Sequence, residues 1–324
     1  MVDQHTHRLI MKTTRAMIAN TRATDRHTGL QVARGVVVAM RLPEWLKNSL
    51  VFAAILFSGN IFSRPAMIHS VMAFLALCMA SSASYFFNDL RDRKTDKTHP
   101  LKSRRPIASE LVPLRVAVVA VLVLATAGIA IGFAVNWRTG RVVLAYLVLT
   151  SLYSLVMKHI VILDVFVLAT GFVLRVIAGA DAIGVAFSSW LVLCTFLLAL
   201  FMGFGKRRHE LLLLEESASS HRPVLHEYSA HFLDMMMVVV TSATVACYAL
   251  YTLDAATIAR FGTHRLVYTS VFVLYGIFRY LYLMYQKSGG GNPTALIYRD
   301  LSLQVDILLW IVSIFFLKYY PTLF

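Results

Sequence analysis

About nine runs of some 20 apolar residues dominate the sequence, and short polar or glycine- and proline-containing breaks separate them. A run of about 20 apolar residues is long enough for one α-helix to cross the hydrocarbon core of a bilayer. The runs lack the alternation of apolar and polar residues that is typical of a membrane barrel, so helices are expected. The expected spans are 46–62, 66–88, 114–135, 141–157, 160–183, 187–206, 231–253, 264–286 and 302–319.

The composition supports the same fold class. Hydrophobic residues make up 58% of the 324 residues, and a mean hydropathy of +0.67 is too high for a soluble domain. We therefore predict an all-α, polytopic membrane protein with a transmembrane domain at 38–324. Residues 1–37 are expected to form a mobile, basic cytoplasmic tail rather than a cleavable signal peptide, because the first apolar run starts only near Leu50.

The distribution of lysine and arginine predicts the orientation. If the N-terminus lies inside, the cytoplasmic segments hold 23 of these residues and the outer segments hold 6. The positive-inside rule then places the N-terminus in the cytoplasm and the C-terminus outside, at the plasma membrane. This asymmetry explains most of the net charge of +14 without a nucleic-acid partner. The cytoplasmic cations can also hold membrane lipid headgroups or phosphorylated substrates.

Asn88, Asp89, Asp92 and Asp96 stand at the cytoplasmic end of the second expected span. In an α-helix Asp89, Asp92 and Asp96 lie at about 0°, 300° and 340°, with Asn88 at about 260°. Carboxylates gathered on one face repel each other and call for cations. Magnesium takes oxygen ligands and commonly shares them with substrate phosphates. The pattern therefore predicts a Mg²⁺ and phosphate site at the inner membrane face.

A simpler interpretation is a solvated helix end, in which the three acids pair with Arg91, Arg93 and Lys94. A helix end that is merely solvated does not need all its acids on one side, so we favour the metal site. The loop that follows carries Lys102, Arg104 and Arg105. These cations suit the remaining oxygens of a polyphosphate, although a pure topology signal is the alternative for the two arginines.

Charged residues at other cytoplasmic helix ends are further candidates. Lys158 ends one expected span, and Asp164 lies near the start of the next, where a charge is costly unless it is used or paired. Arg175 lies about 20° from Asp164 around the same helix and roughly 16 Å deeper. It suits either a phosphate anchor or a structural arginine that caps carbonyl groups of a neighbouring helix.

Two more clusters border the membrane. Lys206, Arg207 and Glu210 end the sixth expected span, where an anion-binding cluster and a plain stop signal remain equal alternatives. Lys47 and Asn48 enter the first expected span, and Lys47 would reach the headgroups in any case.

This combination of spans and motif resembles the UbiA superfamily of intramembrane prenyltransferases, on the basis of Asn-Asp-x-x-Asp-x-x-x-Asp at 88–96. Most members transfer a prenyl group from a prenyl diphosphate to an aromatic or porphyrin acceptor, and a second aspartate-rich motif holds further Mg²⁺. This chain departs from that pattern, because it has no DxxxD between the sixth and seventh expected spans and carries Lys158 and His159 before a lone Asp164. Cations in place of acids fit a substrate with additional phosphate.

The sequence more closely resembles the superfamily branch that transfers phosphoribose to decaprenyl phosphate. The likeness runs from about residue 38 to the C-terminus. The motifs that carry it are Trp45–Asn48, Asn88–Asp96, His99–Pro100, Arg105–Ala108, Tyr153–His159, Gly171–Arg175 with Ala178–Gly179, and Lys206–Leu211.

The resemblance implies a UbiA-like helical bundle with its active site at the cytoplasmic face. It further implies Mg²⁺-dependent transfer of 5-phosphoribose from phosphoribosyl pyrophosphate to a polyprenyl phosphate, with release of pyrophosphate. In actinobacteria this reaction supplies arabinan precursors of the cell wall. Ordinary prenyl transfer to an aromatic acceptor is the alternative activity. A transporter is disfavoured, because the polar residues gather at one face rather than at mid-depth.

These motifs define the predicted site. The metal ligands are Asp89, Asp92 and Asp96, and the catalytic residues are Asp89, Asp92 and Lys158. The substrate-binding candidates are Lys47, Asn48, Asn88, Lys102, Arg105, Tyr153, His159, Asp164, Arg175, Lys206, Arg207 and Glu210. A homo-oligomer is compatible with the sequence.

Overall fold

The computed structural model describes residues 28–100, 102–186, 188–216, 227–287, 296–297 and 299–320. These residues form helices and no strands, which confirms the predicted all-α class. The first half contains α2 (Gly29–Ala39), η1 (Leu42–Phe52), α3 (Ala53–Ser58), α4 (Arg64–Thr98), η2 (Lys102–Arg104), α5 (Leu114–Val135) and α6 (Trp137–Leu155). The second half contains η3 (Met157–His159), α7 (Leu163–Ala182), α8 (Ser189–Glu216), α9 (Ala230–Leu253), α10 (Ala255–Phe261), η5 (Arg265–Thr269), α11 (Ser270–Gln286) and α13 (Leu301–Tyr319).

Seven helices within the described residues are long and apolar enough to cross a membrane: α4, α5, α7, α8, α9, η5 with α11, and α13. The other two expected spans coincide with α6 and with η1 followed by α3. A total of nine spans therefore stays a prediction. The first expected span is not one continuous α-helix, because a 3-10 helix fills its first part and Gly59, with φ of 81°, ends α3.

The predicted boundary between tail and membrane domain, at 37–38, falls inside α2. Thr28 and Gln31 form a capping box at the start of this helix. Val36, within the expected tail, packs against a buried cluster that contains Ala39, Phe86 of α4 and Val112. Part of the expected tail is thus packed against the bundle. Residues 1–27 of that tail lie outside the described residues.

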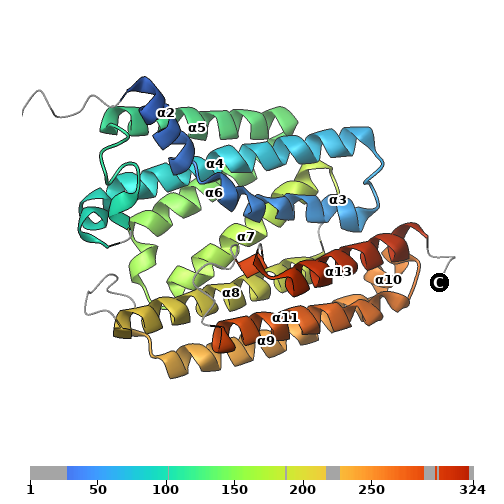
Figure 1. The fold of residues 1–324 in the computed structure, drawn as a ribbon. Helices are drawn as coiled ribbons and strands as arrows, with labels where there is room; N and C mark the ends of the chain where they lie inside the picture. Colours follow the sequence, from blue (N-terminus) through green and yellow to red (C-terminus); the bar gives the residue numbers. More distant parts are fainter. Residues whose placement is uncertain are drawn as a thin grey trace, which may run out of the picture.

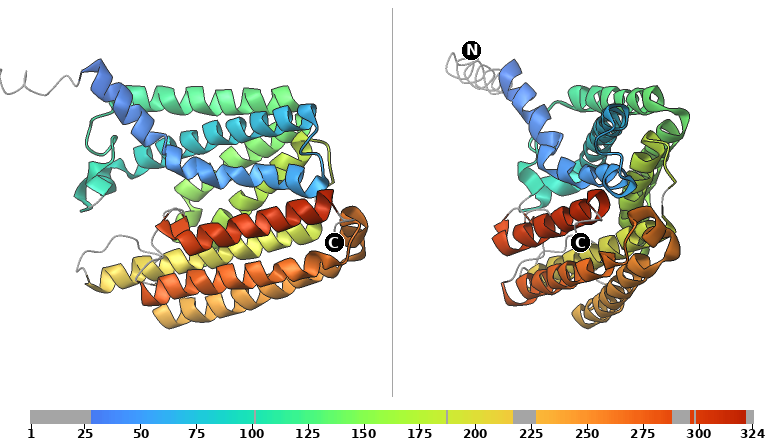
Figure 2. Two further views of the ribbon diagram at one scale, coloured as in Figure 1. Left: turned by 45° about the vertical axis from the view of Figure 1, so that its right-hand side comes forward. Right: turned by 90° about the vertical axis from the view of Figure 1, so that its right-hand side faces the viewer.

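The helices run side by side and alternate in direction (Figures 1 and 2). The C-terminal ends of α4, α6 and α8 therefore meet the N-terminal ends of α5, α7 and α9 at one end of the bundle. We call this the acidic end, because it carries Asp89, Asp92 and Asp96. The opposite end carries α10 and the C-terminal ends of α3 and α13 (Figure 1).

Helix α7 lies at the centre of the bundle and contacts α4, α6, α8, η1 and α3. One apolar cluster joins α7 to α4, α6 and η1, and a second joins it to α8, α9 and α11. Small residues make this packing close, since Ala178, Gly179, Ala180 and Ala182 on α7 are all buried. A Cβ atom added at Gly179 would overlap the backbone carbonyl of Val51 in η1.

We expect Gly179→Ala to destabilise the protein by about 1–3 kcal/mol, because the added methyl group meets backbone that has little room to shift. The thermal unfolding midpoint in detergent should fall by several degrees. Gly29→Ala is the control, since an added Cβ there meets nothing within 4 Å. An unchanged midpoint for Gly179→Ala would contradict the close contact of α7 with η1.

Candidate active site

Helix α4 extends well beyond its apolar part and ends only at Thr98, so the predicted acidic face is indeed helical. Asp89 and Asp96, seven residues apart, are both buried, with 2% and 4% of their surface exposed. Arg105 joins them, because its Nη1 donates to Asp89 Oδ1 at 3.1 Å and to Asp96 Oδ2 at 2.8 Å. Arg41 Nη2 also donates to Asp89 Oδ1, at 2.7 Å. Two cations from separate segments thus neutralise two acids of α4.

Asp92 has a different partner. Lys158 Nζ donates to both of its carboxylate oxygens, at 2.5 and 2.7 Å. Lys158 is buried in η3, between α6 and α7, so this pair ties the end of α4 to the α6–α7 connection. The three acids are therefore matched by three cations that come from outside α4.

The simpler interpretation, in which neighbouring basic residues pair with these acids, is not what the structure shows. Arg91 Nη1 donates instead to the backbone carbonyl of Ser154, at 2.7 Å. Arg93 Nη2 donates to Glu110, at 3.3 Å. Both side chains hold neighbouring segments in place and leave Asp89, Asp92 and Asp96 to their distant partners.

The donor chemistry of the acidic end fits Mg²⁺, because carboxylate oxygens are the ligands that this ion prefers and substrate phosphates usually complete its shell. Within the described residues, no three histidine, cysteine, aspartate or glutamate side chains converge closely enough to hold an ion as they stand. Asp89 and Asp96 face Arg105, whereas Asp92 faces Lys158. The metal role of these aspartates thus stays a prediction that requires the cations to change partners.

Asn48 and Arg175 meet deeper in the bundle. Arg175 Nε donates to Asn48 Oδ1 at 2.7 Å, Nη1 to the carbonyl of Gly171 at 2.7 Å, and Nη2 to the hydroxyl of Tyr146 at 2.9 Å. Asn48 is fully buried and donates in turn to Ser81 of α4. The hydrogen-bond partners of Arg175 are all neutral, and no carboxylate within the described part of the chain forms an ion pair with it.

Lys47 and Lys206 surround Glu44 at the start of η1. Lys47 forms an ion pair with Glu44. Burial alone would raise the pKa of the Glu44 carboxyl, but Lys47, Lys206 and Arg41 together lower this pKa below its ordinary value. Lys206 Nζ also lies 4.0 Å from Glu210 Oε1. The first and sixth expected spans therefore bring their basic residues to the same region.

Arg207 and Asp164 form an enclosed ion pair. Arg207 Nε donates to Asp164 Oδ2 at 2.6 Å, and the two residues are 2% and 0% exposed. The other guanidinium nitrogens donate to Glu210 at 2.6 Å and to the hydroxyl of Tyr153 at 3.3 Å. Of the two alternatives expected for Asp164, a charge that is used or a charge that is paired, the structure shows the pair. Direct substrate contact by Asp164 and Arg207 stays a prediction, and their enclosure favours a supporting role.

Tyr228 supports the same network. Its hydroxyl donates to Asp164 Oδ1 at 2.9 Å and accepts from the backbone N–H of Ile162 at 2.6 Å. Ile162 has a φ of 68°, a conformation that is strained for a β-branched residue. Tyr228 therefore stabilises the turn that connects Lys158 in η3 to α7.

The remaining predicted residues lie at the same end of the bundle. Lys102 stands in η2, and its backbone N–H donates to His99 Nδ1 at 3.3 Å. His159 is exposed and follows Lys158 in η3. Asn88 is half-buried on α4, one residue before Asp89.

Three residues that contribute to this site were not among those predicted from the sequence. Arg41 adopts a left-handed backbone conformation just before η1, and the only signal was its position before Pro43 at the first expected span. Glu44 belongs to no sequence motif that would have indicated a role in the site. Tyr228 ends a polar stretch of the sequence that carried no motif, and 217–226 of that stretch lie outside the described residues.

Comparison with known proteins gives consistent results at the levels of family and fold. The model of the UbiA prenyltransferase family matches residues 49–301. The decaprenyl-phosphate phosphoribosyltransferase of Corynebacterium glutamicum is 32% identical over 300 residues, which cover 90% of this chain and 89% of the relative. The protein of the same name from Mycolicibacterium smegmatis is 31% identical and covers 86% of this chain and 91% of its own.

Solved structures share the fold at lower sequence identity. A UbiA homologue from Archaeoglobus fulgidus, solved with GPP and Mg²⁺ bound, superposes with a TM-score of 0.68 at 18% identity and covers 88% of this chain and 99% of its own. The apo structure of a UbiA homologue from Aeropyrum pernix gives a TM-score of 0.62 at 15% identity, over 83% of this chain and 96% of its own. On the family match and the identity to full-length relatives, the chain belongs to the UbiA prenyltransferase family.

Proposed function

We propose that this protein transfers 5-phosphoribose from phosphoribosyl pyrophosphate to a polyprenyl phosphate, with release of pyrophosphate, at the cytoplasmic face of the membrane. The names of the full-length relatives support this activity. The observation that carries it over ordinary prenyl transfer is the buried Lys158 on Asp92. The connection between α6 and α7 thus carries a cation, whereas most family members are expected to supply further acids there. A cation at this place suits a donor with more phosphate.

Asp89, Asp92 and Asp96 would hold Mg²⁺ at the pyrophosphate of the donor. When bound, the ion neutralises negative charge that develops on the leaving pyrophosphate. Arg41, Arg105 and Lys158 balance the three carboxylates in the free protein and can turn to phosphate oxygens once the carboxylates have another cation. The three carboxylates and the three cations are thus each paired with an opposite charge both before and after the donor binds.

The reaction replaces one bond at the anomeric carbon of ribose. The bond to the pyrophosphate oxygen breaks, and a bond to an oxygen of the polyprenyl phosphate forms, with no proton transfer required. The lipid phosphate is already an anionic nucleophile, so a strong general base is unnecessary. Arg105 and Lys158 stabilise the charge that the departing pyrophosphate takes up as the ribosyl carbon becomes positive.

Arg175 is suited to attract a phosphate group toward the centre of the bundle, because it is a buried cation with neutral hydrogen-bond partners. Asn48 and Tyr146 fix the orientation of its guanidinium group. Lys47 and Lys206, which surround Glu44, extend the positive region toward the surface. The polyprenyl tail would lie between apolar helices, in contact with the bilayer.

The proposed activity can be tested with two labelled donors. Membranes that contain the protein should transfer label from phosphoribosyl pyrophosphate to added polyprenyl phosphate in the presence of Mg²⁺, and chelation should stop the transfer. A parallel reaction with a labelled prenyl diphosphate and an aromatic acceptor should give no product. The proposal fails if only the prenyl diphosphate reaction proceeds.

Asp92→Asn should lower kcat/KM by about a hundredfold or more, because it removes a proposed metal ligand and leaves Lys158 buried without its acid. Asp234→Asn is the matched control, since Asp234, near the start of α9, also pairs with a basic side chain, that of Arg208. The control should retain near-normal kcat/KM. Full Mg²⁺-dependent turnover by a folded Asp92→Asn enzyme would exclude the metal role of Asp92.

Tyr228→Phe should lower kcat/KM about tenfold, because the lost hydroxyl releases Ile162 and Asp164 and loosens the turn that holds Lys158. Tyr285→Phe provides the comparison, since its hydroxyl likewise donates to an aspartate, Asp234, but outside the proposed site. Equal kinetic effects of the two substitutions would show that Tyr228 does not position Lys158.

A further inference from the structure

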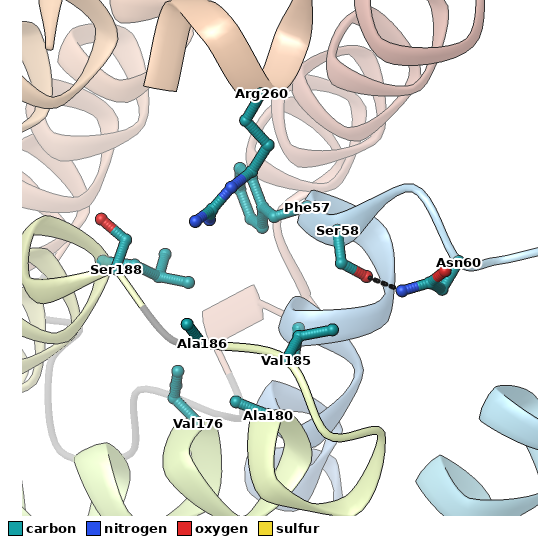
Figure 3. A pocket seen from close by; sticks show the side chains of 11 residues that line it. Phe57, Ser58, Asn60, Val176, Ala180, Val185, Ala186, Ser188 and Arg260 are labelled. Carbon is teal, nitrogen blue, oxygen red and sulfur yellow. Dashed lines mark hydrogen bonds between the residues drawn. The ribbon is translucent and has the colours of Figure 1, made fainter. Parts of the chain in front are cut away.

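A cavity of about 260 Å³ lies at the end of the bundle opposite the acidic residues, and Figure 3 shows it from close by. Its walls are mainly apolar. Ala54 and Phe57 come from α3, Val176 and Ala180 from α7, and Leu191 from α8. The chemistry proposed above uses none of these side chains.

Arg260, at the end of α10, gives this apolar cavity a charged rim. Figure 3 shows its guanidinium group directed into the space, beside Phe57 and across from Ser188. Among the described residues, no carboxylate forms an ion pair with Arg260. Asp254, the acid at the other end of α10, is already bonded to Thr257.

A second cation stands next to this rim. Lys318 of α13 donates to the backbone carbonyl of Arg260, and its side chain packs against Gly59, so that a Cβ added there would lie 2.7 Å from Lys318 Cε. Ser58, which lines the cavity, accepts a hydrogen bond from Asn60 at 3.0 Å. The rim therefore presents the Arg260 guanidinium group and the polar side chains of Ser58, Asn60 and Ser188 above an apolar interior, and Lys318 adds a positive charge behind Arg260.

We propose that this cavity binds an anionic phospholipid from the surrounding leaflet, with the lipid phosphate on Arg260 and the first part of one chain between α3, α7 and α8. A purely apolar ligand would leave the guanidinium group without an anion. A small inorganic anion would leave the apolar walls exposed to water. An amphiphile with a negatively charged head satisfies both. The proposal is independent of the transfer reaction, because the site shares no residue with the acidic end.

The test is a lipid titration of the purified protein, followed by native mass spectrometry. The probe is dioleoyl phosphatidylglycerol, and zwitterionic dioleoyl phosphatidylcholine and inorganic phosphate are compared with it. We expect the wild-type protein to bind phosphatidylglycerol more tightly than either. Arg260→Gln should weaken that binding about tenfold, because it removes a charge-assisted contact to phosphate.

Arg265→Gln is the matched control, since Arg265 is an exposed arginine five residues further along the same end of the bundle and does not line the cavity. It should bind phosphatidylglycerol as the wild type does. Ala186→Phe, on the loop that borders the cavity, should weaken binding of the lipid by occupying its chain site. Equal binding by wild type and Arg260→Gln, or a preference for phosphatidylcholine, would overturn the proposal.

Discussion

Three carboxylates on one face of α4 are matched by three cations from elsewhere in the chain, and the candidate site depends on this match. Arg41 comes from the turn before η1, Arg105 from the segment after α4, and Lys158 from η3. Asp89, Asp96 and Lys158 are the buried members of these pairs, so loss of their partners would leave each of them as an uncompensated buried charge. Each pair therefore holds a separate segment against the end of α4. The same pairs place the cations proposed to bind phosphate beside the acids proposed to bind the metal ion.

Helix α7 supports this arrangement from the centre of the bundle. Near its start Asp164 is enclosed by Arg207 and Tyr228, which stabilises the turn next to Lys158. Eleven residues later, Arg175 is held by Asn48 and Tyr146 and has no acidic partner. One buried charge on α7 is thus compensated by the protein, whereas the other is the one that we propose attracts a phosphate group.

Local periodicity accounts for the parts of the structure that were predictable from the sequence. Apolar runs predicted the helical class, and helical geometry placed Asp89 and Asp96 on one side of α4, where Arg105 joins them. The pairs Asp92–Lys158 and Asp164–Arg207 join residues 66 and 43 positions apart, so they depend on tertiary packing that no local pattern records. The 3-10 conformation of η1 was also missed, because hydropathy measures length and not helix type. Arg41 shows the same limit, since its left-handed turn becomes meaningful only once Asp89 lies beside it.

We propose that the cations of the acidic end exchange carboxylates for phosphate when the donor binds. An experimental structure of the wild-type protein with phosphoribosyl pyrophosphate and Mg²⁺ would show this exchange. We expect Lys158 Nζ to contact a phosphate oxygen, and the oxygens of Asp92 to contact the metal ion instead of Lys158. A donor bound elsewhere, with the Asp92–Lys158 and Asp96–Arg105 pairs intact, would contradict it.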